Sequence, residues 1–209
     1  VIGDCNRSLY SLFQDIAVEK GAEIKFAHIG GIPNYETDLI GSFQQRNIHT
    51  AIEGVALLSE NWKLNKKTIH ESIKNVIKSS NFSGRMQQIS DQPRVILDAA
   101  HNKEGIEGLL KEVQQLEYNS LRIVYGASND KEWQAILADF PIQHTYYFTS
   151  FDSNRSVSSS EFRSELKNSQ LTFTLFNNPL LALNKCKLDA KMNDLILVCG
   201  SFYLMEKII

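Results

Sequence analysis

A short segment that combines a carboxylate and an imidazole, Asp98-Ala99-Ala100-His101-Asn102, follows a predicted strand at 94–97 that is apolar from Val95 on, and precedes residues with helical spacing. A strand followed directly by a helix directs the free N–H groups of the helix into the crevice at the carboxyl end of the strand. Open α/β sheets bind anionic ligands there. The segment therefore predicts a nucleotide site in which Asp98 serves a ribose and His101 a phosphate. In the alternative interpretation, Asp98 and Asn102 only cap the helix and His101 is a surface residue.

A glycine and an arginine, in Ser83-Gly84-Arg85-Met86, precede the predicted strand by a few residues. Glycine permits a close approach of backbone and ligand, and the planar guanidinium of Arg85 suits phosphate or ribose oxygens. Alternatively, Arg85 is an exposed side chain after a turn.

Two further segments follow later predicted strands, at 126–131 (Gly-Ala-Ser-Asn-Asp-Lys) and at 200–203 (Gly-Ser-Phe-Tyr). Because the carboxyl ends of parallel strands meet at one edge of a sheet, we expect both beside Asp98. At 200–203 the small residues let backbone and hydroxyl approach a ligand. In the alternative interpretation of 126–131, Ser128 or Asp130 is the N-cap of the next helix.

The elements that must position these residues alternate along the second part of the chain. Strands are predicted at 94–98, 121–125, 144–149, 171–176 and 194–199, and helices at 68–79, 103–116, 131–140, 159–168 and 179–187. This alternation predicts an α/β fold with a mainly parallel, doubly wound, Rossmann-like sheet.

The first part of the chain predicts the tail of a separate α/β domain at 1–60. Its expected elements are a helix around 9–17, a short strand at 24–27, turns after Gly30, and a helix around 48–58. The polar segment 61–67 is interpreted as a linker. Thr68 and Glu71 have the spacing of a capping box, so the second domain is expected at 68–209.

Composition excludes several classes of function. The 209 residues carry a net charge of −2, which argues against a broad basic surface for nucleic acid. Three cysteines without a C-x-x-C pair argue against a disulfide framework or a zinc site and fit a reducing cytoplasm. The histidines other than His101 lack metal-ligand spacing. There is no 18-residue apolar run, and the first residues lack the basic-then-apolar layout that is typical of a signal peptide. Because the chain opens without methionine on Val1-Ile2-Gly3, we expect it to be part of a longer protein.

The chain contains no G-x-x-x-x-G-K-[ST] loop, no G-x-G-x-x-G motif and no G-x-S-x-G elbow. Micromolar nucleotide binding requires about 8 kcal/mol, whereas a helix N-terminus contributes only about 0.3 to 2 kcal/mol per favourable contact. We therefore expect a second surface outside this chain to complete the site.

Taken in order, these motifs resemble the C-terminal half of folylpolyglutamate synthase, including its bifunctional dihydrofolate synthase form, in the Mur ligase superfamily. The segment 38–47 (Asp-Leu-Ile-Gly-Ser-Phe-Gln-Gln-Arg-Asn) resembles the family's L-x-G-x-H-Q-x-x-N segment, which ends its central ATPase domain. Segments 83–86 and 98–102 resemble its G-R and D-x-A-H-N motifs, Asp130-Lys131 its D-K pair, and 200–203 its G-S-x-Y.

The resemblance implies an ATP-dependent ligase. ATP phosphorylates a carboxylate of a pteroate or folyl chain, and the amine of L-glutamate attacks the acyl phosphate. The P-loop, the Mg²⁺ ligands and a carbamylated lysine belong to the family's N-terminal domain. By the same resemblance, Asn47 contacts adenine, Asp98 the ribose, and Arg85 the ribose or phosphates. His101 acts catalytically at the phosphate or the incoming glutamate, and Ser201 lies on the glutamate side. The expected partners are these small molecules, without nucleic acid or membrane, and the expected state is a monomer.

Three residues depart from the family pattern. Phe43 replaces a histidine, Ala99 stands where glycine is frequent, and Lys103 stands where proline usually follows the asparagine. Lys103 keeps a positive charge by the nucleotide edge.

A Mur-type peptidoglycan ligase is a competing hypothesis, but some of these enzymes carry a G-K-G-H-E-like ending instead of the 200–203 sequence. A nucleotide-binding α/β module without catalysis is another. We expect the 209-residue chain alone to be inactive.

Overall fold

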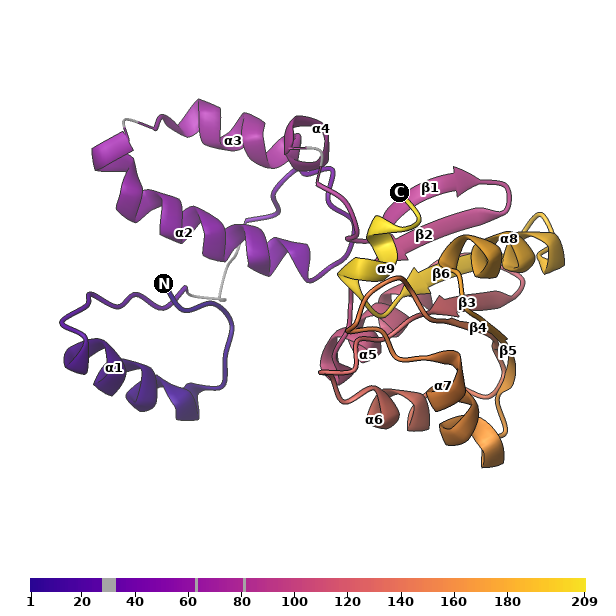
Figure 1. Ribbon diagram of the computed structural model, residues 1–209. Coiled ribbons are helices and arrows are strands. Elements are labelled where there is room, and N and C mark those ends of the chain that lie inside the picture. Colours follow the sequence, from indigo (N-terminus) through magenta and orange to yellow (C-terminus); the bar gives the residue numbers. More distant parts are fainter. Residues whose placement is uncertain (28–32, 63, 81) are drawn as a thin grey trace. The chain divides into compact units, whose positions relative to one another are not determined.

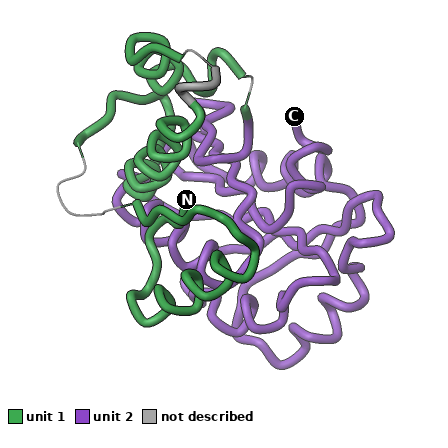
Figure 2. The backbone as a smooth tube through the Cα atoms, turned by 90° about the vertical axis from the view of Figure 1, so that its left-hand side faces the viewer, with its two compact units in different colours: residues 1–82 green, residues 83–209 purple. Residues whose placement is uncertain are grey.

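The computed structural model describes residues 1–27, 33–62, 64–80 and 82–209. The chain divides into two compact units, Val1–Phe82 and Ser83–Ile209 (Figure 2). Each unit is described by itself.

The larger unit, 83–209, is built on a six-stranded sheet in the order β1-β2-β6-β3-β4-β5 (Figure 1). Its strands are β1 Gln87–Asp91, β2 Arg94–Asp98, β3 Leu121–Tyr125, β4 Thr145–Thr149, β5 Thr172–Phe176 and β6 Leu195–Cys199. Only β1 is antiparallel to its neighbour, and the other pairs of adjacent strands are parallel. The predicted mainly parallel sheet is confirmed, and its five expected strands are present within a residue of the predicted bounds.

Helices cover both faces of this sheet (Figure 1). The helices are α5 Lys103–Val113, α6 Trp133–Ala138, α7 Ser159–Glu165, α8 Pro179–Asp189 and α9 Phe202–Glu206, with a 3₁₀ turn at Leu166–Asn168. Buried residues of α5, α6 and α7 share one core cluster, and those of α8 and α9 share a second. Successive residues of β6 join the two clusters alternately, as Ile196 and Leu197 do, because side chains alternate across a strand. The doubly wound arrangement is therefore confirmed.

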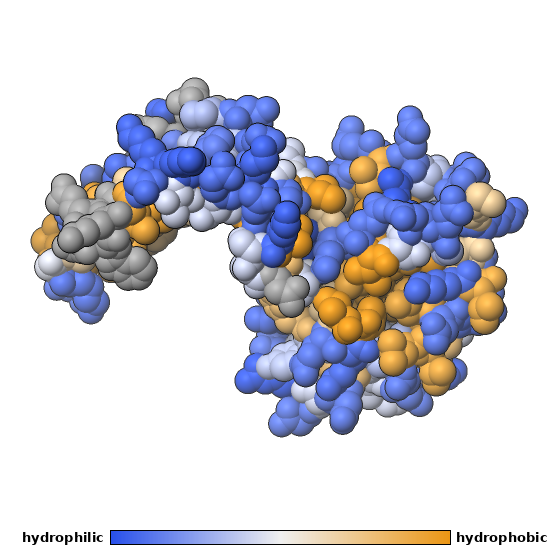
Figure 3. Space-filling view, turned by 90° about the horizontal axis from the view of Figure 1, so that it is seen from above, coloured by the Kyte–Doolittle hydropathy of each residue, from blue (hydrophilic) through white to orange (hydrophobic). Residues whose placement is uncertain are grey.

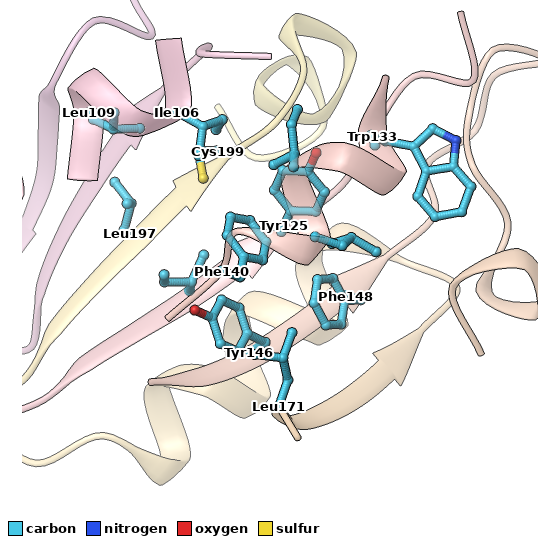
Figure 4. Close-up of a cluster of buried hydrophobic side chains, with 14 of the residues drawn as sticks. Ile106, Leu109, Tyr125, Trp133, Phe140, Tyr146, Phe148, Leu171, Leu197 and Cys199 are labelled. Carbon is cyan, nitrogen blue, oxygen red and sulfur yellow. The ribbon is translucent and has the colours of Figure 1, made fainter. Parts of the chain in front are cut away.

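Aromatic rings fill the first of these clusters (Figure 4). The ring of Tyr125 meets Phe140 edge-on at 5.1 Å between centroids, and Phe140 stacks on Tyr146 at 4.9 Å. The hydroxyl of Tyr125 is buried and has no hydrogen-bond partner among the described residues, and burial raises its pKa well above the usual range. These packed rings form a rigid layer next to the carboxyl end of β3, where Gly126 begins the next loop.

Exposed apolar side chains interrupt the hydrophilic surface of the larger unit (Figure 3). Helix α8 contributes several of them, because it buries Leu183 and Cys186 but leaves Leu181 and Leu188 exposed. Among the described helices, none combines the length and apolar content that a membrane span requires.

The cysteines of the larger unit fill its core. Cys186 and Cys199 are buried, and burial raises the pKa of the Cys186 thiol to about 12. At neutral pH this thiol therefore stays protonated and unreactive. Cys5, in the smaller unit, is half-buried.

The smaller unit, 1–82, is mainly helical. Its elements are a 3₁₀ turn at Arg7–Leu9 and the helices α1 Tyr10–Glu19, α2 Gln44–Trp62, α3 Lys66–Lys74 and α4 Val76–Ser80. The strand predicted at 24–27 is reduced to an isolated parallel bridge between Ile2 and Phe26. The turns predicted from Gly30 to Ile32 lie outside the described residues, as does His28.

The predicted linker at 61–67 is helical at both of its ends. Helix α2 continues through Trp62, and α3 already begins at Lys66. The side chain of Asn65 accepts the N–H of Thr68 at 2.8 Å, so Asn65 is the N-cap and the capping box predicted from Thr68 is wrong. The polar composition of the segment reflects an exposed helix start rather than a linker.

Helices α3 and α4 belong to the smaller unit, whereas the sequence placed them at the start of the second domain. The carboxylate of Asp38 accepts the N–H groups of Ile77 and Lys78 at 3.1 and 3.2 Å, at the start of α4. Glu36 forms an ion pair with Lys74 at the end of α3. These bonds tie the helices to the segment before α2, so the boundary lies between residues 82 and 83.

Replacing Asp38 with alanine tests this boundary. We expect Asp38→Ala to weaken the docking of α4 by about 1–2 kcal/mol, because two helix N–H groups lose a charged acceptor. Hydrogen exchange of residues 76–80 in the 209-residue chain should accelerate accordingly, by roughly tenfold. Asp15→Ala, which removes an exposed carboxylate on α1, is the matched control. Equal exchange in both variants would mean that Asp38 does not hold α4.

Candidate functional site

The loops that follow β2, β6, β3 and β4 meet at the carboxyl edge of the sheet, because these strands are parallel neighbours in that order. The N–H of Gly200 donates to the carbonyl of Ala100 at 2.9 Å, which joins the β6 loop to the β2 loop. The hydroxyls of Ser128 and Ser201 lie 3.1 Å apart and join the β3 loop to the β6 loop. The sequence-predicted meeting of these segments is therefore present in the structure.

Asp98 connects the end of β2 to the turn that contains Arg85. Its Oδ2 accepts the N–H of Met86 at 2.9 Å, and its Oδ1 accepts the N–H of Ala100 at 2.8 Å. The N–H of Ala99 also donates to the carbonyl of Gly84 at 2.8 Å. Asp98 therefore fixes two backbone segments, and the alternative in which it caps α5 is wrong. The cap is Asn102, as the alternative interpretation held for that residue, and its side chain accepts the N–H of Gly105 at 2.8 Å.

The turn at 84–86 needs the conformational freedom of glycine. Gly84 has φ +80°, a conformation that L-residues with a side chain rarely adopt, and Met86 follows at φ +46°. These two positive φ angles turn the chain, so the backbone of Arg85 lies against the end of β2. The side chain of Met86 is fully buried, which anchors the turn.

Burial dominates the electrostatics of Asp98, which is 3% exposed. Desolvation raises the pKa of its carboxyl, against the two N–H bonds from Met86 and Ala100 and the positive charge of Arg85, which favour ionisation. The folded state therefore favours the ionised form less than the unfolded chain does, and this group lowers the free energy of unfolding as the pH rises through its raised pKa. Since a carboxylate offers about four lone-pair positions, two remain for a ligand hydroxyl.

His101 is held in one orientation by the backbone. Its Nδ1 lies 2.9 Å from the carbonyl oxygen of Ala99. Because a carbonyl can only accept, Nδ1 carries the proton, and in the neutral ring Nε2 is an acceptor. The ring is half-buried, so the alternative of a freely exposed surface histidine is wrong.

Arg85 rests on an aromatic ring. Its guanidinium carbon lies 5.2 Å from the centroid of the Phe202 ring, and its side chain is partly buried. The alternative of a simple exposed arginine after a turn is therefore wrong. Phe202 was missed as a functional candidate because nothing in the local sequence shows which residue, more than 100 positions away, its ring will meet.

Ser201 lies beneath the surface of this edge, 2% exposed. It is the N-cap of α9, and its Oγ accepts the N–H of Tyr203 at 3.2 Å. Ser128 is also buried and contacts Ser201, so it does not cap α6 as the alternative interpretation held. Asp130 does not cap it either, since α6 begins at Trp133 without a side-chain cap.

A second arginine, which the sequence analysis did not single out, lies at the same edge. The Nη1 of Arg155 lies 3.3 Å from the hydroxyl of Tyr203, and its guanidinium carbon lies 5.9 Å from the centroid of that ring. Its backbone carbonyl accepts the N–H of Asn129 at 2.7 Å. Its position just after β4 was the available signal, because loops after parallel strands share this edge.

Asn47 lies in the smaller unit, in the first turns of α2. It is exposed, and its Nδ2 donates to Oε1 of Gln44 at 3.2 Å. A hollow of about 470 Å³ lies beside it, lined by Gly3, Asp4, Phe43, Arg46, Asn47 and Thr50. Phe43, which departs from the family pattern, therefore adds an aromatic ring to the same hollow.

Two charged residues of the motifs have other partners. Lys103, expected to keep its charge at the nucleotide edge, forms an ion pair with Asp139 at 2.6 Å. The Nζ of Lys131 lies 3.8 Å from Oδ2 of its neighbour Asp130.

Within the part of the chain that the structure describes, no group of three or more His, Cys, Asp or Glu side chains is placed to hold a metal ion.

The chain is similar to known ligases over most of its length. Dihydrofolate synthase/folylpolyglutamate synthase of Bacillus subtilis (strain 168) is 26% identical over 204 residues, which are 94% of this chain and 46% of that protein. Folylpolyglutamate synthase of Lacticaseibacillus casei is 31% identical over 109 residues, 51% of this chain and 24% of that protein.

Among solved structures, E. coli FolC in complex with ADP, without folate substrate, aligns with a TM-score of 0.72 and 25% identity, covering 95% of this chain and 51% of that one. The chain thus spans about half of the length of the E. coli and B. subtilis relatives. Residues 84–202 match the family model of the Mur ligase, glutamate ligase domain. Since that match covers more than half of the 209 residues, the chain belongs to the Mur ligase family, with the glutamate ligase domain at residues 84–202.

Proposed function

We propose that this chain is the C-terminal part of an ATP-dependent ligase that adds L-glutamate to folates through an acyl phosphate. The enzyme would be a folylpolyglutamate synthase, with or without dihydrofolate synthase activity. The observation that carries the proposal is the grouping of Arg85, Asp98 and His101 at the carboxyl edge of the sheet, in a chain similar to such enzymes over 94% of its length.

The nucleotide is proposed to lie against the turns at 84–86 and 98–102. Arg85 presents N–H donors to phosphate oxygens, where negative charge accumulates during phosphoryl transfer. The lone pairs of Asp98 that the backbone leaves free accept ribose hydroxyls. Asn47 and Phe43 are proposed to contact the adenine, since they line one hollow of the smaller unit.

His101 is proposed to act where the amine of glutamate attacks. With Nδ1 bonded to the carbonyl of Ala99, its Nε2 is free to accept a proton or to position the amine. Ser201 is proposed on the glutamate side, although its present partners are Ser128 and the N–H of Tyr203. A hydroxyl can donate one bond and accept two, which leaves capacity for a substrate.

The P-loop and most ligands of a divalent cation are proposed to lie in the N-terminal half of the protein. Related structures are described as complexes with AMPPNP and Mn ion, and with Mn, AMPPNP and L-glutamate. We propose ATP and Mg²⁺ as the corresponding ligands here, residues 1–82 as the end of the ATPase domain, and a cytoplasmic monomer as the working form.

Incorporation of isotope-labelled glutamate tests the proposal. The full-length protein, given ATP, Mg²⁺ and a folate or dihydropteroate, should form a labelled product, whereas the 209-residue chain alone should not. Labelling of a muramyl peptide instead would identify a Mur-type peptidoglycan ligase, and nucleotide binding without any ligation would identify a non-catalytic module. An active 209-residue chain would contradict the division of the site between two parts.

Substitution of Asp98 tests its double role. Asp98→Asn keeps one acceptor oxygen, so the N–H of either Met86 or Ala100 loses its partner. We expect unfolding of the 209-residue chain in urea to show a loss of about 1–3 kcal/mol. The full-length variant should need roughly tenfold more ATP, as for a lost bond to a charged group.

Asp91→Asn, an exposed carboxylate at the end of β1, is the matched control for both measurements and should change neither. An unchanged ATP requirement in Asp98→Asn would reject the ribose role. An unchanged unfolding free energy would reject the role in holding the turn at 84–86.

A further inference from the structure

One exposed ring, that of Phe202, faces two of the proposed functional side chains. Phe202 is the first residue of α9 and is 48% exposed. The guanidinium carbon of Arg85 lies 5.2 Å from its ring centroid, and the ring of His101 lies 6.2 Å away, inclined at 53°. The three residues come from three segments that are distant in the sequence, so this contact exists only in the folded unit.

The backbone at Phe202 is fixed by hydrogen bonds of the two residues before it. The N–H of the preceding Gly200 donates to the carbonyl of Ala100, beside His101. Ser201 caps α9 and contacts the hydroxyl of Ser128. The start of α9 is therefore fixed to the loops after β2 and β3, and the ring has a defined position relative to His101.

Arg85 has a well-fixed backbone but a long side chain. The turn around it is bonded to Asp98 and Ala99. Across the described part of the chain, no carboxylate lies within ion-pair distance of its guanidinium, although its charge favours ionisation of Asp98. The contact that the structure shows for this guanidinium is the face of Phe202.

An aromatic face holds a guanidinium differently from a carboxylate. A carboxylate uses two of the five N–H donors of arginine, whereas the face of a ring attracts the charge and leaves the donors at the rim available. An arginine held in this way is both ordered and ready to bond anionic oxygens. Ordering before binding improves affinity, because less side-chain freedom is lost when the ligand arrives.

We infer that Phe202 is a positioning residue that holds the guanidinium of Arg85 with its N–H donors open toward the anionic oxygens of a nucleotide. The inference deepens the proposed function and rests on it for the identity of the ligand. In the family segment G-S-x-Y that 200–203 resembles, Phe202 occupies the variable position, so the motif itself assigns it no role.

The experiment measures binding of a non-hydrolysable ATP analogue with Mg²⁺ to the full-length protein by titration calorimetry. Phe202→Leu removes the aromatic face but keeps an apolar side chain, and we expect about threefold to fivefold weaker binding. Phe202→Tyr and Phe202→Trp keep a face for the guanidinium and should bind as the wild type does. Phe202→Met, which is flexible and close in size, serves as a second variant without a ring.

A double-mutant cycle separates positioning from general damage. Arg85→Ala should weaken binding by more than Phe202→Leu does, and adding Phe202→Leu to Arg85→Ala should cause no further loss. Tyr118→Leu, a partly buried aromatic residue that precedes β3 at the opposite edge, is the matched control and should bind normally.

Three outcomes would overturn the inference: additive losses in the double variant, equal losses in the leucine and tryptophan variants, or normal binding by both Phe202→Leu and Phe202→Met. These measurements do not need ligation to occur. Nucleotide binding that depends on Phe202 in a protein that ligates no glutamate would overturn the proposed function alone. A wild type that binds no nucleotide would overturn both.

Discussion

Loss of the imidazole at position 101 is expected to reduce the turnover of the full-length enzyme by about 10²- to 10⁴-fold, the usual contribution of a positioned acid or base. The Nδ1 of His101 is bonded to the carbonyl of Ala99, so the backbone sets the direction of Nε2, which is proposed to meet the amine of glutamate. In His101→Ala this group is absent, while the proposed nucleotide contacts of Arg85 remain. The Michaelis constant for ATP should therefore change much less than kcat.

Steady-state rates of glutamate incorporation at saturating ATP check this expectation. His144→Ala is the matched control, because His144 lies just before β4, at the opposite edge of the same sheet. Burial lowers the pKa of that histidine, so it is neutral at assay pH and its loss removes no charge. A kcat for His101→Ala within twofold of the wild type would show that the imidazole takes no part in the reaction.

Among the substitutions proposed for this chain, Gly200→Ala is expected to lower the free energy of unfolding the most. The loss should be about 3 kcal/mol or more, through backbone strain together with overpacking. Gly200 has φ +116°, where a side chain is strained whatever the space around it. A Cβ atom there would also collide with the carbonyl oxygen of Gly126 and with the ring of Tyr125, 2.8 Å away. Neither neighbour can move easily, because one is backbone and the other is packed among aromatic rings.

Urea unfolding of the 209-residue chain, followed by circular dichroism, measures this loss. Gly108→Ala is the matched control: Gly108 lies inside α5 with nothing within 4 Å of an added Cβ. That variant should be more stable by about 0.5–1 kcal/mol, because alanine favours a helix over glycine. If Gly200→Ala were as stable as Gly108→Ala, the close packing of the β6 loop on the β3 loop would be disproved.

The sequence predicted the sheet of the larger unit well, because strands buried on both faces are continuous apolar runs, as in Leu195–Cys199. It missed β1, whose sequence Gln-Gln-Ile-Ser-Asp is polar and lies at the sheet edge, half exposed. It also missed α9, which is only five residues long. The unit boundary was misplaced because the bonds of Asp38 to the start of α4 span about 40 positions, which no local pattern reveals.

The site was predictable in part for a similar reason. Polar residues directly after buried strands are visible in a sequence, and so Asp98, His101 and Ser201 were found. Their partners were not, since the bond from Met86 to Asp98 and the contact of Arg85 with Phe202 depend on how separate loops meet. The predicted roles of these residues toward ATP and glutamate remain proposals, which the variants above test.

The last strand of the chain, β6, lies in the middle of the sheet, between β2 and β3. Its register pairs Leu195 with both Arg94 and Leu121, so the two halves of the sheet are joined only through residues about 75 to 100 positions later. During synthesis, a nascent chain cannot complete this sheet until residue 199 has left the ribosome. Long-range pairing of this kind slows folding, and a premature stop codon even a few residues before β6 would leave two unjoined β-sheet edges open to aggregation.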